Sequence, residues 1–188
     1  MILIGNTINP SVIVIGVFHG DEPQGEILIN NYFKITKNTN LLMIPRLNAC
    51  NKRTNQNGVD LNRNFPTKNW ELTIKNEYFG GLTPASEKET QFIIDTIKKF
   101  NPKIILTLHA PYKIVNYDGP YHPIIKDIAE ILKYPIETSI GYPTPGSFGT
   151  WAGIENNITT ITLELDENSK IEELQPKMNK IFKLLERI

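Results

Sequence analysis

The amino-acid sequence predicts an α/β fold, a three-layer sandwich in which helices cover a mixed, largely parallel central sheet. Short apolar runs rich in β-branched residues alternate along the chain with amphipathic helical patterns, and this alternation is typical of a sheet with helices on its faces. The 188 residues contain no repeat, low-complexity tract or Gly/Ser linker. A chain of this length can bury about 70% of its unfolded surface in one core, so we expect a single domain over residues 1–188.

The composition argues against several classes of function. Lys plus Arg and Asp plus Glu are balanced at 20 each, so the chain lacks the positive charge that attracts nucleic acid or an anionic membrane. The longest apolar run near the N-terminus, residues 12–18, is too short for a membrane span or a typical signal sequence. Cys50 is the one cysteine, which rules out an internal disulfide framework. We therefore expect a cytoplasmic protein that binds neither nucleic acid nor membrane.

The first half of the chain begins with a buried strand and continues into a long polar loop. Residues 11–18 form a continuous β-branched run, as expected of a strand covered on both faces. Pro23 suits the first position of a helix over residues 24–33, and residues 41–45 predict a second short strand. Residues 48–79 show little apolar periodicity, and a loop of that length is more often functional than not.

The second half continues the alternation of helix and strand. Ser86 and Glu89 predict a capping box at the start of a helix over residues 86–100, and residues 103–108 predict a buried strand. The remaining predictions are a loop over 111–121, a helix over 123–132, a short strand over 136–140, a Gly- and Pro-rich loop over 141–149, a strand over 159–165 and an amphipathic helix over 171–188. Pro176 should kink the last helix or move its start.

Candidate metal ligands lie where the predicted strands end. In an open α/β sheet the ligand site lies beyond the carboxyl ends of the strands, where His19, Glu22 and His109 are placed. Two imidazoles and one carboxylate with a fourth open position are the ligand set of a catalytic zinc site, so the sequence predicts one zinc ion here. In the alternative interpretation His19 caps a helix, Glu22 is a surface residue and His109 is a satisfied interior histidine. We expect His122, which precedes Pro123, to be structural.

Glu164, near the end of the last predicted strand, is the candidate general base. A carboxylate on a buried apolar strand is costly unless it meets charge or moves a proton. A zinc-activated water still needs a base. The alternative is a strand-end glutamate that faces solvent beside Asp166 and Glu167.

Residues 57–66 predict a loop that is held rigidly and aimed at a ligand. Val59, Leu61 and Phe65 recur along this otherwise polar stretch, and a plain surface loop would not need such apolar anchors. We expect them to be buried, so that the polar side chains between them face a specific target.

The polar residues of this loop suggest contacts with a substrate. Arg63 offers a fork of donors suited to a carboxylate, and Asn62 beside it supplies a neutral donor. Arg53, earlier in the same long loop, could stabilise an oxyanion, and Asp60 could accept from the free ring nitrogen of a zinc-bound histidine. The alternative for Arg53 is a solvated side chain near Lys52.

Together these residues resemble a zinc carboxypeptidase of the pancreatic carboxypeptidase superfamily. The motifs that carry the resemblance occur in the family's order: His19-Gly-Asp-Glu22, Arg53-Thr-Asn followed by Gly58-Val-Asp-Leu-Asn-Arg63-Asn-Phe-Pro66, Leu108-His109-Ala-Pro111 and Thr162-Leu-Glu164-Leu. Three stretches look most like the murein peptide amidase A branch: Pro84-Ala-Ser-Glu-Lys-Glu-Thr90, His109-Ala-Pro111 and Tyr142-Pro-Thr-Pro-Gly-Ser-Phe-Gly-Thr-Trp151. The resemblance extends over residues 12–166, and the joint occurrence of the motifs is highly specific.

The resemblance implies catalytic roles for the matching residues. His19, Glu22 and His109 would bind zinc, as the strand ends also suggest. Glu164 would be the general base, and Arg53 would polarise the scissile carbonyl and hold the oxyanion.

The resemblance also implies how a substrate would be held. Asn62 and Arg63 would bind the free carboxylate of the leaving portion, and Asp60 would orient His19. Tyr142 falls near the mobile tyrosine that carboxypeptidases place over the substrate. Members of this branch cleave the amide between γ-D-glutamate and meso-diaminopimelate in cytoplasmic murein tripeptide, a step of cell-wall recycling, so a small peptide substrate is implied.

The sequence departs from the family at its N-terminus. Family members carry an additional strand or two ahead of the first buried strand, whereas only residues 1–10 precede it here. This difference predicts an exposed edge of the sheet, which a second copy of the chain could cover in a homodimer.

Three other functions stay open. The chain could be a generic zinc carboxypeptidase, or an acylase of the aspartoacylase and succinylglutamate desuccinylase type, although the motif over residues 142–151 argues against the acylase. It could also be a muropeptide-binding protein without hydrolytic activity. Such a protein would be expected to lose the base or the oxyanion group, whereas Glu164 and Arg53 are both present.

Overall fold

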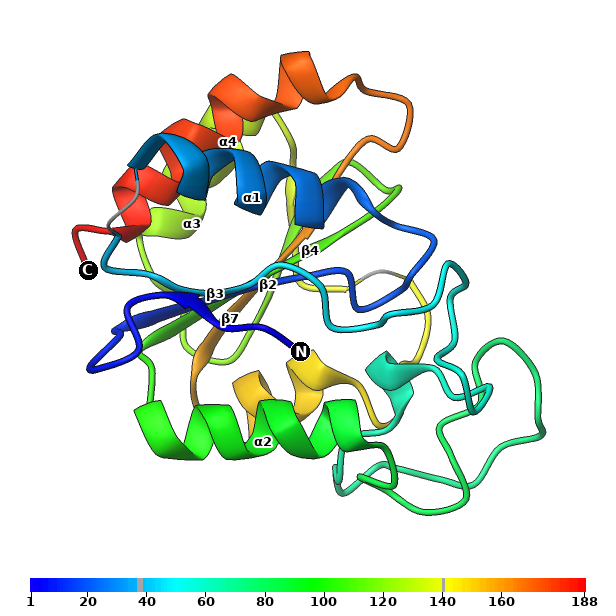
Figure 1. Ribbon diagram of the computed structural model, residues 1–188. Helices are drawn as coiled ribbons and strands as arrows, with labels where there is room; N and C mark the ends of the chain where they lie inside the picture. Colours follow the sequence, from blue (N-terminus) through cyan, green and yellow to red (C-terminus); the bar gives the residue numbers. More distant parts are fainter. Residues whose placement is uncertain (37–38, 140) are drawn as a thin grey trace.

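A seven-stranded mixed sheet forms the centre of the protein (Figure 1). The computed structural model describes residues 1–36, 39–139 and 141–188. In spatial order the strands are β1 (Ile4–Gly5), β3 (Leu42–Ile44), β2 (Val12–Gly16), β4 (Ile104–His109), β7 (Thr159–Glu164), β5 (Ile114–Asp118) and β6 (Ile136–Glu137). The predicted α/β class with a mixed, largely parallel sheet is confirmed.

The directions of the strands bring several strand ends to one edge of the sheet. β2, β4 and β7 are parallel neighbours, and β3 is parallel to β2. β5 runs antiparallel to β7, so that Ile114 pairs with Glu164 at one end and Asp118 pairs with Thr160 at the other. The carboxyl ends of β2, β4 and β7 therefore meet the beginning of β5.

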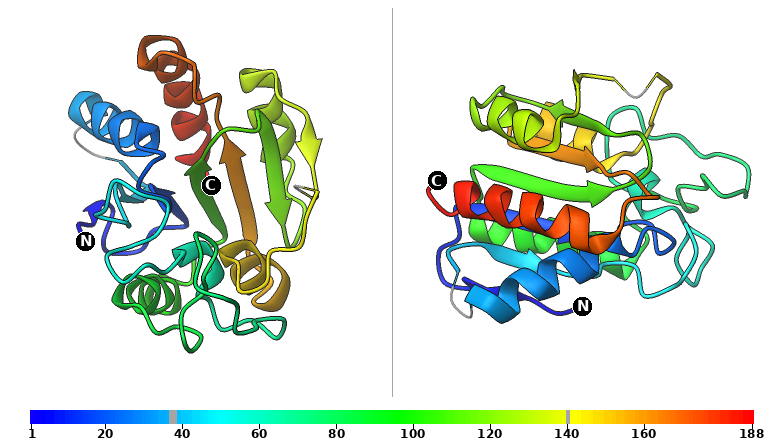
Figure 2. Two further views of the ribbon diagram at one scale, coloured as in Figure 1. Left: turned by 90° about the vertical axis from the view of Figure 1, so that its right-hand side faces the viewer. Right: turned by 90° about the horizontal axis from the view of Figure 1, so that it is seen from above.

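Helices cover both faces of the sheet and complete the three layers (Figures 1 and 2). α1 (Gln24–Thr36), α3 (Ile124–Leu132) and α4 (Ile171–Leu185) lie on one face. On the other face lie α2 (Lys88–Phe100) and a short π-helix, η2 (Thr150–Glu155). A single 3-10 turn, η1 (Leu61–Arg63), lies in the long segment between β3 and α2. Within the described ranges, no helix combines the length and the apolar character needed to cross a membrane.

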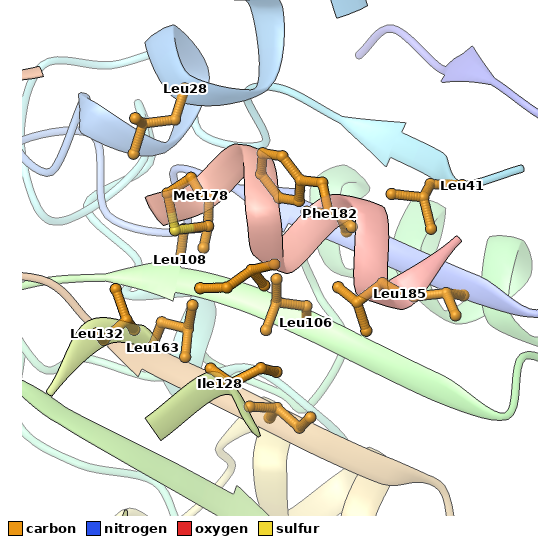
Figure 3. Close-up of a cluster of buried hydrophobic side chains, with 14 of the residues drawn as sticks. Leu28, Leu41, Leu106, Leu108, Ile128, Leu132, Leu163, Met178, Phe182 and Leu185 are labelled. Atoms are coloured by element: carbon orange, nitrogen blue, oxygen red, sulfur yellow. The ribbon is translucent and has the colours of Figure 1, made fainter. Parts of the chain in front are cut away.

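Alternating side chains of the central strands fill two separate cores. Val12 and Val14 of β2 pack toward α1 and α4, whereas Ile13 and Ile15 pack on the side of α2, as the two-residue period of a strand requires. Burial of each such Val or Ile side chain stabilises the fold by about 1.5–3 kcal/mol. Packing on both faces therefore fixes the position of the central strands and of the residues at their ends. Figure 3 shows part of the first core, with Leu28, Leu41, Leu106, Leu108, Ile128, Leu132, Leu163, Met178, Phe182 and Leu185 labelled.

One stretch predicted as loop contains a strand, and one predicted cap is wrong. Residues 111–121 include β5, and η2 occupies Thr150–Glu155, where no element was predicted. α2 begins at Lys88 rather than residue 86, and Ser86 does not cap it, because the Ser86 hydroxyl donates to the Glu87 carboxylate at 2.7 Å.

The ends of the chain also differ from the expectations. α4 begins at Ile171, so Pro176 lies inside the helix without moving its start. Residues 1–10 include β1, which pairs antiparallel with β3, so the predicted bare edge carries a two-residue strand. β6 ends at Glu137, and residue 140, where a longer strand was predicted to end, lies outside the described residues.

Candidate active site

An unusual turn after β2 delivers His19 and Glu22 to the edge of the sheet. Val17 has a φ of 54°, a left-handed conformation that β-branched residues rarely adopt. Its carbonyl accepts from the Asn48 amide at 2.9 Å, so the segment after β3 holds this turn in place. Backbone strain of this kind is often found at functional sites.

Gly20 lets the turn between His19 and Glu22 lie close to the long loop. Its amide donates to the Lys52 carbonyl at 2.9 Å, and an added Cβ would overlap the Cys50 carbonyl oxygen. A residue with a side chain would therefore push this turn away from the long loop.

His19, Glu22 and His109 converge as predicted. His19 Nδ1 lies 2.8 Å from Glu22 Oε1, and His109 Nδ1 lies 3.0 Å from Glu22 Oε2. One candidate ligand atom from each residue lies within 4.8 Å of the others. Phe18 stacks on the His109 ring with a centroid distance of 5.4 Å. The alternative in which these residues serve unrelated structural purposes does not fit this convergence.

The charges of this cluster stabilise one another. Burial disfavours a charged imidazole, but hydrogen bonds with Asp60 and Glu22 outweigh it and raise the pKa of His19 to about 9. Burial also opposes the ionised form of Glu22, yet hydrogen bonds from His109 and His19 lower its pKa to about 2. Glu22 is therefore an ionised carboxylate at neutral pH, as a metal ligand should be.

Asp60 contacts His19, as the sequence predicted, and it also holds Arg53. Its Oδ1 lies 3.2 Å from His19 Nε2, and its Oδ2 accepts from Arg53 Nε at 3.0 Å. Asp60 is completely buried. Burial alone would raise its pKa, but His19, Arg53 and Arg63 hold the pKa of Asp60 well below its usual range. The fixed Arg53 guanidinium also lies over the Tyr78 ring, 4.8 Å from its centroid.

The loop over residues 57–66 is anchored as predicted. Val59, Leu61 and Phe65 are buried. The Phe65 amide donates to the Gly146 carbonyl at 2.9 Å, so this loop packs directly on the Gly- and Pro-rich loop. An L side chain in place of Gly146, whose φ is 70°, would overlap the carbonyl oxygen of Arg63.

Asn62 and Arg63 line two adjacent cavities at the site. The Asn62 side-chain oxygen accepts from the Phe148 amide at 2.9 Å, which leaves its NH2 group as a donor in the cavity that also contains His109 and Glu164. Arg63 is buried, and its Nη1 donates to the Asn62 carbonyl at 2.8 Å. The two residues thus offer the neutral donor and the cation that the sequence predicted.

Glu164 is a buried carboxylate beside a candidate metal ligand. It pairs across the sheet with His109, and its Oε2 has no hydrogen-bond partner among the residues that the structure describes. Burial raises the pKa of Glu164 above its usual value. The alternative of a solvent-facing glutamate at this strand end is therefore wrong.

Tyr142 lies between the two cavities and contributes to the lining of both. Its side chain is 42% exposed, which suits a residue that can swing over a substrate. Burial of the remainder and a hydrogen bond with Tyr112 raise the pKa of Tyr142. His122 lies apart from this cluster and accepts from the Ile124 amide at 3.2 Å, in agreement with its expected structural role.

The residues present fit a catalytic zinc ion. Two imidazole nitrogens and one carboxylate converge at a buried position beside a cavity, and this donor set is the one that zinc hydrolases use. The Nε2 atom of His19 faces Asp60, so the Nδ1 atom is the one available to an ion.

The sequence interpretation missed the residues that form the floor of the second cavity. Asn116 and Asp118 belong to β5 and line this cavity, but their stretch was predicted as loop. The signal was present, because Ile114, Asn116 and Asp118 alternate with Val115 and Tyr117 as the two faces of a strand do.

Comparisons with known proteins agree with this geometry. Residues 32–125 match the zinc carboxypeptidase family. The chain is also 30% identical over 173 residues to murein peptide amidase A of Escherichia coli K12, covering 82% of this chain and 70% of that protein. The chain belongs to the zinc carboxypeptidase family. Membership makes it a hydrolase of the metallopeptidase type, and the family implies zinc.

Other relatives agree in sequence or in fold. Murein peptide amidase A of Vibrio campbellii is 35% identical over 138 residues, covering 66% of this chain and 54% of that protein. The crystal structure of the murein-tripeptide amidase of Escherichia coli O157 superimposes with a TM-score of 0.86 at 26% identity, covering 98% of this chain and 85% of that chain. Carboxypeptidase A of Helicoverpa armigera has a TM-score of 0.77 at 17% identity, covering 98% and 63% of the two chains, and shares the fold.

Replacing Asp60 with Asn should weaken zinc binding. Asp60→Asn keeps the size of the side chain but removes the charge that faces His19 Nε2. We expect the affinity for zinc to fall about 10- to 100-fold, as for other partners of metal-bound histidines. Competition with a chromogenic chelator measures this affinity. Asp95→Asn, an exposed position on α2, is the matched control, and equal affinities in the two variants would contradict the role of Asp60.

Proposed function

We propose that this protein is a zinc-dependent amidase that hydrolyses the amide bond before a residue with a free carboxylate. The proposed substrate is murein tripeptide, and the bond cleaved is the amide between γ-D-glutamate and meso-diaminopimelate. Support comes from family membership, from relatives named murein peptide amidase A, and from the arrangement of residues at the edge of the sheet. We propose further that it acts as a single domain in the cytoplasm.

The buried carboxylate of Glu164 carries the proposal of a hydrolase rather than a binding protein. It lies next to His109 in the sheet register, it has a raised pKa, and it has an oxygen without a partner among the described residues. A buried unpaired carboxylate destabilises the fold, so its retention beside a metal-ligand cluster favours a role in proton transfer. A muropeptide-binding protein would not need this group.

His19, Glu22 and His109 would hold one zinc ion. When bound, zinc polarises a carbonyl and lowers the pKa of a water ligand toward about 7. Asp60 keeps His19 in the required orientation through the Nε2 contact of 3.2 Å, so the Nδ1 atom stays directed at Glu22.

Glu164 would act as general base and then as general acid. It accepts a proton from the attacking water and transfers it to the nitrogen of the leaving residue as the amide bond breaks. Burial raises its pKa and brings it closer to the operating pH, where a base is most effective.

Arg53, Asn62 and Arg63 would position the substrate and stabilise developing charge. Asp60 binds Nε and Nη2 of Arg53 at 3.0 and 2.9 Å, which fixes the guanidinium as a source of positive charge for the oxyanion. The free NH2 of Asn62 and the guanidinium of Arg63 would bind the carboxylate of the leaving residue. Tyr142 would close over the substrate from the rim that both cavities share.

The zinc-loaded protein should release diaminopimelate from L-Ala-γ-D-Glu-meso-diaminopimelate. Chromatography of the free amino acid measures the reaction, and removal of zinc with a chelator should abolish it. Hydrolysis of ordinary C-terminal peptide bonds without diaminopimelate release would favour the generic carboxypeptidase. Release of an acyl group from N-acyl amino acids alone would favour the acylase.

Glu164→Gln should bind zinc normally and lose turnover. The amide cannot accept the proton of water, so kcat should fall about 10²- to 10⁴-fold, while metal content measured by emission spectroscopy stays at one ion per chain. Glu167→Gln, an exposed position beyond the same strand, should behave like the unmodified protein. Retained activity in Glu164→Gln would mean that another residue is the base.

Arg63→Ala should mainly affect substrates with a free carboxylate. Loss of one charged hydrogen-bonding partner should raise KM for the free-acid peptide about 10- to 100-fold. The corresponding amidated peptide should change little. Comparison of kcat/KM for the two peptides measures the discrimination, and unchanged discrimination would remove this role from Arg63.

A further inference from the structure

A polar cavity extends from the candidate metal cluster down one face of the sheet. His109, Glu164 and Asp118 of β5 all contribute to its lining. None of the roles proposed above uses Asp118.

The strand register places Asp118 deep in the cavity. Side chains of alternate residues share a face, and on this face His109, Glu164 and Ile114 form one row across β4, β7 and β5. The next two rows are Thr107, Thr162 and Asn116, and then Ile105, Thr160 and Asp118. Successive rows are about 7 Å apart along the strands, so a short side chain that enters the cavity beside Glu164 would end well short of the Asp118 row.

Asp118 is a half-buried carboxylate without a cationic partner. Among the described residues, no ion pair or hydrogen bond reaches its side chain, and burial raises its pKa. The described lining of the cavity contains no lysine or arginine. Because a desolvated carboxylate is costly until a cation meets it, a bound ligand is the natural source of that cation.

A second acceptor lies one row above Asp118. The Asn116 side-chain NH2 donates to the Glu137 carbonyl at 3.0 Å, so its amide oxygen remains free to accept. An ammonium group has three donors and no acceptor. The carboxylate of Asp118 and the oxygen of Asn116 therefore match an ammonium better than a neutral or anionic group.

Two glycines leave room for this carboxylate. An added Cβ at Gly149 or Gly153 would overlap the Asp118 side chain. Both glycines flank or belong to η2, the π-helix beside β5, and π-helical turns are frequent at functional sites. The cavity floor thus depends on small residues opposite Asp118.

We propose that Asp118 determines specificity by binding the terminal ammonium of a long side chain on the leaving residue, as in lysine or diaminopimelate. This inference rests on the proposed function, because the α-carboxylate of that residue must be held by Asn62 and Arg63 for its side chain to enter the cavity. The hydroxyls of Thr138 and Ser139 line the same cavity and suit the second carboxylate of diaminopimelate.

Binding of free amino acids tests the role of Asp118 without relying on turnover. L-Lysine and L-norleucine differ in the terminal ammonium, which norleucine lacks. Calorimetry on the zinc-loaded protein should find lysine bound about 10- to 100-fold more tightly than norleucine, the range expected for one charged hydrogen-bonded pair. In Asp118→Asn this ratio should fall to about 1, while norleucine binding stays the same.

The matched control is Asp127→Asn, an exposed position on α3, which should keep the preference for lysine. Asp118→Asn removes an uncompensated charge, so its melting temperature should be equal to or higher than that of the unmodified protein. Equal binding of lysine and norleucine, or a preference that persists in Asp118→Asn, would overturn the inference.

Turnover separates this inference from the proposed function. Three tripeptides are compared, in which lysine, norleucine or meso-diaminopimelate follows L-Ala-γ-D-Glu. The rate at which each third residue is released is measured. If Asp118-dependent binding of lysine is found but no peptide is cleaved, the assigned reaction is wrong and the ammonium site stands. If the peptides are cleaved without a preference for the ammonium, the reaction stands and the role of Asp118 is wrong.

Discussion

The site depends on one fully buried carboxylate. The two oxygens of Asp60 face the ring of His19, the guanidinium of Arg53 and the backbone amide of Asn62, which donates to Oδ1 at 2.9 Å. A buried charge is tolerated only when its partners satisfy it. The same contacts therefore stabilise the fold and set the relative positions of a proposed metal ligand, a proposed oxyanion group and a proposed carboxylate-binding residue.

Hydrogen bonds join the long loop to Gly146 and Phe148 of the Gly- and Pro-rich loop next to that carboxylate. Phe65 and Gly146 share a backbone hydrogen bond, and the Phe148 amide donates to Asn62. Buried apolar side chains fix the remaining positions, with Val59 and Leu61 at 3% and 0% exposure. A loop whose one regular element is a short 3-10 turn can therefore fix the positions of its side chains.

How far the sequence predicts this protein varies with the surroundings of each element. The central strands and the helices that cover them follow from β-branched runs and amphipathic periodicity, because both signals reflect burial. His19, Glu22, His109 and Glu164 could be assigned to strand ends for the same reason. η2 and the position of Ser86 depend on contacts with distant segments, and local sequence carries no record of those.

β5 was missed for a different physical reason. Its inward face carries Asn116 and Asp118, which line a cavity instead of an apolar core, so the alternation of the strand lacks the usual apolar residues on that face. Such conflicts between local pattern and fold are expected where a surface serves a ligand. The strand that the sequence prediction missed is thus the one that contributes Asn116 and Asp118 to the second cavity.

The antiparallel direction of β5 has a consequence for how such enzymes can diversify. Asn116, beside Thr162, and Asp118, beside Thr160, line the cavity at increasing distance from Glu164. The candidate metal ligands come from β4 and from the turn after β2. A substitution at one of these positions of β5 can therefore change the length or charge of the side chain that the cavity accepts. The candidate metal ligands, which lie on other segments, stay unchanged.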